Sequence, residues 1–149
     1  MDDVKLIREL NKILTLEHGH LGIYRDFLDF EDKEIRRVFR RFSEIEAEHI
    51  QKLKNVLENL GAGPSPIMEG GDLIGSLFGI SLKGLTSDRR LLETYSLIEK
   101  KSYEGYSAFV AELEQDTEPR NNFIAETAAS NMLEAQLMHL WLEHKLTQI

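Results

Sequence analysis

The sequence predicts an all-α fold in which four long helices form one bundle. Apolar residues recur at helical spacing in four blocks, and no block shows the sustained alternation that is typical of β-strands. Glycine, proline or clustered acids separate the blocks. A chain of 149 residues fits a single domain, 1–149, with one core. The expected helices cover about residues 3–30, 32–60, 87–115 and 118–147, with a long connection at 61–86.

The first two helices follow from their apolar stripes and from the acidic turn between them. The stripes are Leu10, Leu14, Leu21 and Leu28 in the first helix, and Val38, Phe42, Leu53, Val56 and Leu60 in the second. Asp29, Glu31 and Asp32 mark the turn, and Gly61 opens a Gly-Ala-Gly-Pro-Ser-Pro stretch that ends the second helix. Because the turn is short, the two helices should form an antiparallel hairpin.

The last two helices have stripes and start signals of their own. The stripes are Leu92, Tyr95, Tyr103, Tyr106, Val110 and Leu113, and then Ala125, Ala128, Met132 and Leu146. Thr86 or Ser87 can cap the third helix, and Thr117 can cap the fourth. Pro119 falls in the first turn of the fourth helix, where a missing amide proton costs little. These two helices should form a second antiparallel hairpin.

The connection at 61–86 is much longer than a tight turn and decides the expected topology. A helix of about 28 residues is roughly 42 Å long, and a connection of this length can span it. The second and third helices are therefore expected to run parallel, joined by a crossover. The segment DLIGSLFGISLKGL, residues 72–85, is interpreted as packed on the bundle. The alternative is contact with a membrane surface or an apolar substrate.

Composition excludes several classes of function. The net charge of −8 argues against a nucleic-acid partner, because such proteins present clustered Lys and Arg. The absence of cysteine excludes disulfides and thiolate metal sites. The acidic N-terminal stretch MDDVKLIREL shows no export signal, and no run reaches the roughly 18 apolar residues of a membrane-spanning helix. A cytoplasmic location is the default expectation.

Each predicted helix places a metal-binding type of side chain on its apolar stripe. Carboxylates in an apolar core cost several kcal/mol each unless a buried Lys or Arg, protonation or a bound cation compensates them, and no Lys or Arg lies on these stripes at the same level. Two divalent ions would supply the missing charge, and carboxylate and imidazole ligands suit iron or manganese. The candidate metal ligands are Glu17, Glu46, His49, Glu99, Gln136 and His139.

The two halves of the chain show a related design. Tyr24 follows Glu17 by seven residues, and Tyr106 follows Glu99 by seven. Both tyrosines are candidate hydrogen-bond donors to the carboxylates. The halves are not in strict register, since Glu17 precedes His49 by 32 residues and Glu99 precedes His139 by 40, but the longer segment of the last two helices could absorb the difference. His18 and His20 are interpreted as surface or supporting residues, although His20 lies near enough to the Glu17 stripe to join a metal site.

The elements Glu17…Glu46-Ala-Glu-His49…Glu99…Gln136-Leu-Met-His139 resemble the ferritin-like superfamily over nearly the whole chain. The chain is similar to rubrerythrin-like bundles that lack a rubredoxin domain, and LEHGHLGIYRDF, EAEHIQKL and EKKSYEGY also resemble the demethoxyubiquinone hydroxylases. The resemblance implies a ferritin-like bundle and a site with two iron ions, or mixed iron and manganese, that reacts with oxygen or peroxide.

The resemblance to the ferritin-like superfamily implies a role for each candidate ligand. Glu17 and Glu99 would be terminal ligands, Glu46 a bridge, and His49 and His139 the imidazole ligands. Gln136 departs from the family pattern, which has Glu there, so it is expected to be a weak ligand or a hydrogen-bond partner. Glu143 lies four residues past His139 and is an alternative source of the missing carboxylate.

These features lead to three functional hypotheses. The first is an oxidase, peroxidase or ferroxidase that uses an external electron donor. The second is a hydroxylase of a quinone-like substrate with residues 72–85 as the apolar contact, although membrane association is not favoured. The third is a non-enzymatic metal-storage or structural bundle. The apolar flanks of the fourth helix, Leu140 and Leu142, favour a homo-oligomer, a dimer or larger.

Overall fold

The computed structural model describes residues 1–26, 30–63 and 87–149. Within these ranges it contains four helices and no strand, which confirms the predicted all-helical bundle. The helices are α1 (Asp3–Asp26), α2 (Lys33–Asn59), α4 (Asp88–Glu114) and α5 (Pro119–Leu146). Residues 27–29 and 64–86, with the apolar segment 72–85 and the predicted crossover, lie outside the described residues.

The helix starts illustrate how local chemistry sets the boundaries. The Asp32 side chain caps α2 by accepting hydrogen bonds from the amides of Glu34 and Ile35, at 2.8 and 3.2 Å. Ser87, one of the two predicted caps, does the same for α4. The predicted Thr117 cap is wrong, because α5 begins at Pro119 and its capping position is Glu118. Proline favours the first helical position, so the residue directly before it becomes the cap.

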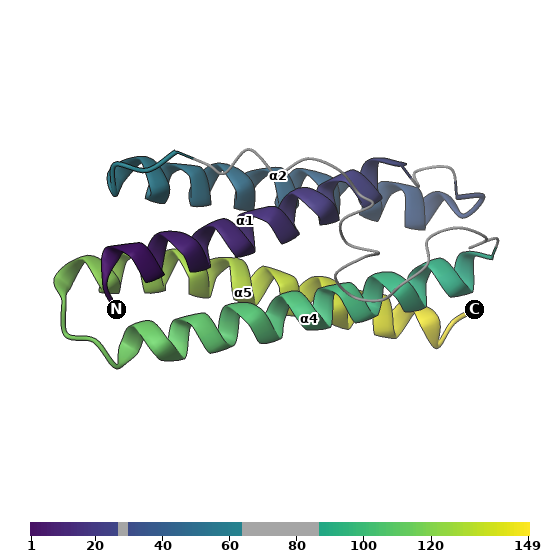
Figure 1. Cartoon of the computed structure of the whole chain (residues 1–149). Helices are drawn as coiled ribbons and strands as arrows, with labels where there is room; N and C mark the ends of the chain where they lie inside the picture. Colours follow the sequence, from purple (N-terminus) through teal and green to yellow (C-terminus); the bar gives the residue numbers. More distant parts are fainter. Residues whose placement is uncertain (27–29, 64–86) are drawn as a thin grey trace.

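The four helices form two pairs that pack against each other. Contacts join α1 to α2 and α4 to α5 within the pairs, and α1 to α4 and α2 to α5 between them. Figure 1 shows that α1 and α5 run in one direction and α2 and α4 in the other. Every contacting pair of helices is therefore antiparallel, and α2 and α4 run parallel without being neighbours.

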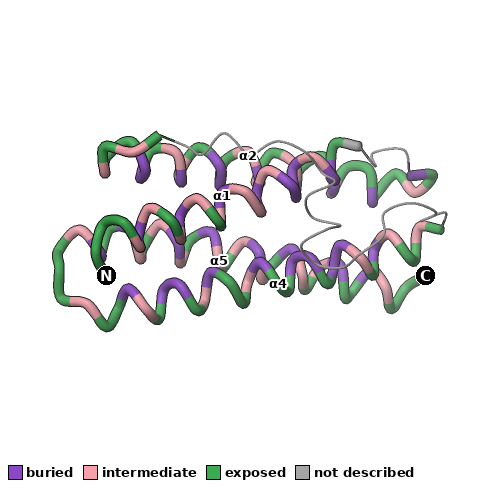
Figure 2. Tube along the Cα trace, in the orientation of Figure 1, coloured by how far each residue is buried: buried purple, intermediate pink, exposed green. Residues whose placement is uncertain are grey.

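Apolar side chains fill the bundle in two clusters, one toward each end. The first cluster contains the buried apolar residues of α1 up to Leu21 and of α2 from Ile50 onward. The second contains those of α1 from Ile23 onward and of α2 up to Phe42. Figure 2 shows the buried residues on the sides that the helices turn toward one another. Fully burying each such side chain contributes about 1.5–3 kcal/mol. The middle of the bundle, between the two clusters, is where buried polar residues gather.

The inward face of α5 differs from the predicted one. The residues that α5 buries are Asn121, Ile124, Ala128, Asn131, Ala135, Met138, Leu142 and Lys145, one position away from most of the predicted stripe. The physical reason is that α5 is apolar on its outer side as well, where Leu133 and Leu137 are 60% and 65% exposed. An apolar pattern that runs around a helix does not indicate which side faces the core.

None of the described helices combines the length and apolar character that crossing a membrane requires.

Candidate metal centre

Four of the six predicted ligands meet in the middle of the bundle. Glu17 comes from α1, Glu46 and His49 from α2, and Glu99 from α4, and each has an exposed fraction of 1% or less. His20 of α1 joins them and is equally buried. His20 is therefore not a surface residue. It lies beside Glu17, as the alternative interpretation of the sequence expected.

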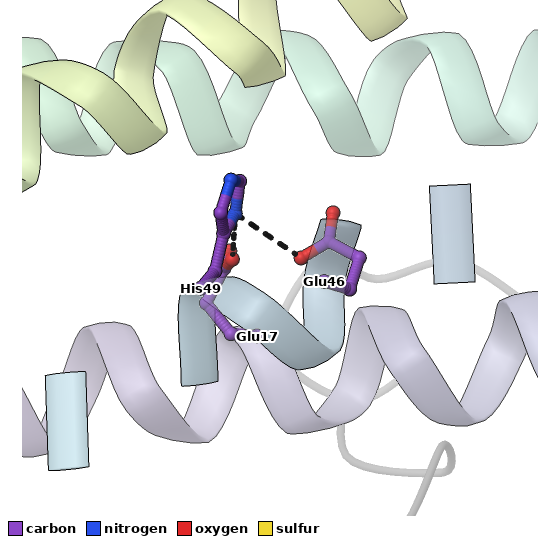
Figure 3. A group of neighbouring side chains, drawn as sticks. All are labelled: Glu17, Glu46 and His49. Atoms are coloured by element: carbon purple, nitrogen blue, oxygen red, sulfur yellow. Dashed lines mark hydrogen bonds and ion pairs between the residues drawn. The ribbon is translucent and has the colours of Figure 1, made fainter. Parts of the chain in front are cut away.

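The first group of potential ligands is Glu17, Glu46 and His49. The Nδ1 atom of His49 lies 2.7 Å from Oε2 of Glu17 and 3.6 Å from Oε2 of Glu46. In Figure 3 both interactions converge on this one ring nitrogen, and the side chains of Glu46 and His49 extend from α2 toward the bundle interior. One ligand atom from each of the three residues lies within 4.8 Å of the others. This spacing suits ligands arranged around one ion.

The second group is His20, Glu46 and Glu99, whose ligand atoms also lie within 4.8 Å of one another. Nδ1 of His20 is 3.8 Å from Oε1 of Glu46. It is also 3.3 Å from Oε1 of Glu17, one helical turn earlier on α1. Glu46 belongs to both groups, and one of its oxygens faces each. The two groups therefore share a central carboxylate.

Several polar atoms of this centre have no hydrogen-bond partner. They are both ring nitrogens of His20, both carboxylate oxygens of Glu46 and Oε2 of Glu99. Such atoms cost free energy when they are buried without a partner. The buried cation of the described residues, Lys145, pairs with Asp32 and Glu34 instead. Oxygen and imidazole donors without another cation fit a bound transition-metal ion.

Burial and mutual charge shift the pKa values of the three carboxyls in different directions. Burial opposes ionisation of Glu17, but the nearby ring of His20 and the hydrogen bond with His49 outweigh it and hold the pKa of Glu17 well below its usual range. Burial and the charges of its carboxylate neighbours raise the pKa of Glu46 well above its usual range. Burial also raises the pKa of Glu99. Burial and mutual repulsion therefore oppose the simultaneous ionisation of all three carboxyls.

His49 is held from both sides of its ring. Its Nδ1 faces Glu17, and its Nε2 lies 3.3 Å from Oε1 of Glu134 on α5. Burial lowers the pKa of His49, but the hydrogen bonds with Glu134 and Glu17 dominate and raise it to about 12. Glu134, with 28% of its side chain exposed, is thus the α5 carboxylate that contacts the centre. It fixes the ring with Nδ1 toward Glu17 and Glu46.

Hydroxyl groups support the other carboxylates. Tyr24 donates a hydrogen bond of 2.7 Å to Oε1 of Glu99, which confirms its expected role. Ser102 donates one of 3.2 Å to Oε1 of Glu17. Burial and the charges of Glu99 and Glu46 raise the pKa of Tyr24 well above its usual range, so the phenol keeps its proton. These donors hold the two carboxylates in position.

Gln136 and His139, the two ligands predicted from α5, do not join either group. Both are half-buried. The expectation that they lie on the inward face is wrong, because the buried face of α5 is one residue away from the predicted stripe. Nδ1 of His139 lies 3.0 Å from the carbonyl oxygen of Ser96, beside a surface pocket of about 510 Å³. Glu143 is exposed and accepts a hydrogen bond from Ser96 rather than replacing Gln136 as a ligand.

The sequence held a signal for His20. Glu17 and His20 are three residues apart, the same spacing as Glu46 and His49. Residues three apart lie on neighbouring parts of one helix face, so a buried Glu17 brings His20 toward the interior. Comparison with known proteins finds no matching family model and no matching curated protein. Function is therefore inferred from the centre itself.

Proposed function

We propose that the protein binds two transition-metal ions, iron or mixed iron and manganese, and uses them to react with oxygen or peroxide. The observation that carries the proposal is the shared position of Glu46 between two ligand groups. Each group also contains a second carboxylate and an imidazole. One bridging carboxylate with a separate carboxylate and imidazole for each ion is a donor set that suits a pair of iron or manganese ions.

Charge supports the assignment. Glu17, Glu46 and Glu99 are fully buried and repel one another when ionised, which is reflected in the raised pKa values of Glu46 and Glu99. Two divalent ions would compensate all three carboxylates and the repulsion between them. When bound, such ions supply Lewis acidity and one-electron redox chemistry, with electrons from an external donor.

The surroundings prepare the centre for that chemistry. Tyr24 and Ser102 hold Glu99 and Glu17, and Glu134 orients His49, so the ligands need little rearrangement. The two apolar clusters on either side exclude water from the ligands. The helix directions, with α2 and α4 parallel, agree with the ferritin-like arrangement that the sequence resemblance implies.

Metal analysis of protein expressed with ample iron tests the proposal. We expect about two equivalents of metal per chain, with anomalous scattering placing both beside Glu46. Glu46→Gln should lose most of the metal, because an amide is a poor bridging ligand. Glu44→Gln is the matched control, since Glu44 is on the same helix with 56% of its side chain exposed. Fewer than about half an equivalent in the unsubstituted protein contradicts the proposal.

Reaction with oxygen or peroxide is tested separately on the metal-loaded protein. Reduced, iron-loaded protein should consume oxygen or hydrogen peroxide faster than the same amount of ferrous iron in buffer. Glu46→Gln protein should not exceed the buffer rate, and Glu44→Gln protein should match the unsubstituted protein. Metal binding without this acceleration would favour the storage or structural hypothesis instead.

A further inference from the structure

A line of exposed residues runs along the outer side of α5, from its first turns to the cap residue Thr147. Its members follow one another at alternating spacings of three and four residues and are Phe123, Glu126, Ser130, Leu133, Leu137, Leu140, His144 and Thr147. An average spacing of 3.5 residues keeps side chains on one face of a helix, as in the seam of a two-helix coiled coil. We call this line the α5 seam.

The α5 seam carries large apolar side chains in contact with water. Four of its residues have exposed fractions between 52% and 65%, and these are Phe123, Leu133, Leu137 and Leu140. Elsewhere in the described part of the chain, the exposed large apolar residues are Val4, Leu97 and Ile149. Leu142, which was expected to form an apolar flank with Leu140, is instead buried in the core. The outer apolar surface of α5 is therefore concentrated on one line, which is typical of a surface that a partner covers.

Apolar surface continues on both sides of the α5 seam. Toward α2, Ile45 and Trp141 line with Leu137 a groove of about 300 Å³. Toward α4, Leu97 lines the pocket that also contains His139. The seam is about 36 Å long at 1.5 Å per residue, and a strip of that length about 20 Å wide covers roughly 700 Å². A stable interface buries about 800 Å² on each partner, so the seam with its flanks is large enough for one.

The order of residues along the α5 seam matches a second copy of the same seam that runs in the opposite direction. When Leu133 faces Leu137 of the second copy, every position of the seam has a partner. Ser130 then faces Leu140, Glu126 faces His144, and Phe123 faces Thr147. The leucines of both copies form the centre of the contact, and the acid of the seam meets its imidazole. The seam is thus complementary to itself in both apolar character and charge.

Other alignments of two seams lose this complementarity. A shift by seven residues in one direction places the Glu126 carboxylate against Leu137, and a shift in the other direction places His144 against Leu133. In a parallel pair each residue faces its own copy, so the two Glu126 carboxylates repel each other. The antiparallel alignment with Leu133 against Leu137 is therefore the favoured one.

We propose that the α5 seam is the interface of a homodimer, in which two copies of α5 pack antiparallel about a twofold axis. The inference goes beyond the proposed function, because no contact in this interface depends on a bound metal ion. The seam lies on the side of α5 that faces away from the buried residues Asn131 and Met138. Each copy therefore keeps its own candidate metal centre inside its own bundle.

Sedimentation equilibrium of the full chain tests the dimer, and we expect a mass twice that of one chain at micromolar concentrations. Leu137→Glu should raise the dissociation constant of the dimer at least about 100-fold, because it brings two carboxylates into the apolar centre of the interface. Val4→Glu is the matched control and should leave the dimer unchanged, since Val4 is 76% exposed on α1, a helix that α5 does not contact. Far-ultraviolet circular dichroism checks that each variant is folded.

A charge exchange tests the antiparallel alignment. His144→Glu places a second carboxylate opposite Glu126 at both ends of the interface and should weaken the dimer about 10-fold. Adding Glu126→Lys to this variant should restore the affinity of the unsubstituted chain, because each new ammonium group then faces a carboxylate. In a parallel dimer each substituted residue would face its own copy, and no restoration would follow.

Each outcome supports or overturns a stated part of the inference. A monomer at micromolar concentrations, or a dimer that Leu137→Glu leaves intact, overturns the proposed interface. A dimer that Leu137→Glu weakens but the charge exchange does not restore overturns the antiparallel alignment. A monomer that binds phosphatidylcholine vesicles, and loses this binding in Leu137→Glu protein, would assign the seam to a lipid surface and overturn the homodimer. Metal content, measured separately, should be equal in the unsubstituted and Leu137→Glu proteins, so the failure of the dimer leaves the proposed function standing.

Discussion

The α1/α2 pair and the α4/α5 pair are the two halves of one bundle, but they contribute different chemistry to its centre. The first pair places two carboxylates and two imidazoles in the core, whereas the second contributes one carboxylate, Glu99, and the hydroxyl of Ser102. Both pairs contribute side chains to each of the two apolar clusters. Most of the carboxylates and both imidazoles of the two ligand groups therefore come from one pair.

The largest expected effect comes from removing the central charge of the first pair. Glu46→Leu should stabilise the metal-free protein by about 2–4 kcal/mol, because it replaces a buried carboxylate without hydrogen bonds by an apolar group of similar size. The same variant should gain nothing from metal, whereas the unsubstituted protein should gain roughly 3 kcal/mol at a metal concentration about 100 times the Kd. Urea unfolding with and without Mn²⁺ measures both.

Glu44→Leu provides the control on the exposed side of α2 and should change the free energy of unfolding by less than about 0.5 kcal/mol. A metal-free Glu46→Leu protein that is less stable than the unsubstituted chain would show that Glu46 is well accommodated without an ion. That result would remove the energetic reason for placing metal between the pairs.

A smaller effect is expected where the second pair supports a ligand of the first. Glu134→Gln keeps the size of the side chain but removes the charge that faces Nε2 of His49. Metal affinity at the first position should fall about 10–100-fold, because the ring is held less firmly and its Nδ1 is a weaker donor. Competition with a chelator of known affinity measures the change. Glu126→Gln, at an exposed α5 position, should have no effect, and equal losses in both variants would refute the supporting role of Glu134.

The pH dependence of stability should have opposite signs with and without metal. In the metal-free protein the pKa of His49 is raised to about 12, so its protonated form stabilises the fold fully below the unfolded value near 6.5. That contribution is lost as pH rises from about 6.5 toward 12. Metal binding releases protons from the ligands, so metal-loaded protein should instead become more stable over the lower part of this range.

Thermal melts at about pH 7 and pH 9, with and without Mn²⁺, check these signs. His49→Gln should abolish most of the loss of metal-free stability at high pH, because the substituted side chain carries no proton to lose. A metal-free protein whose stability rises between these pH values would contradict the ion pairing of His49 with Glu17 and Glu134.

Much of the fold and of the first pair could be predicted from the sequence. Phe42, Glu46, His49 and Leu53 share one stripe with polar residues opposite, so their inward direction follows from periodicity alone. Residues of α5 could not be placed in this way, because Leu133 and Leu137 make its outer side apolar too. Contacts with α2 and α4 decide the rotation of α5, and they turn Asn131 inward and leave His139 beside the surface.

The smallest effect concerns the helix starts of the two pairs. Asp32 caps α2 with two hydrogen bonds, whereas Glu118 at the start of α5 makes none with its side chain. Glu118→Ser should therefore stabilise the protein by about 0.5–1 kcal/mol, because a serine hydroxyl can accept from the exposed amides of the first turn. The substitution also removes the exposed ion pair with Arg120, but such pairs contribute about 0–1 kcal/mol, so the net gain stays small and positive. Urea unfolding measures it, and Glu118→Ala, which removes the same ion pair without adding a cap, is the matched control. If serine and alanine give equal stabilities, the start of α5 is not limited by its missing cap, and the difference between the pairs lies in the core alone.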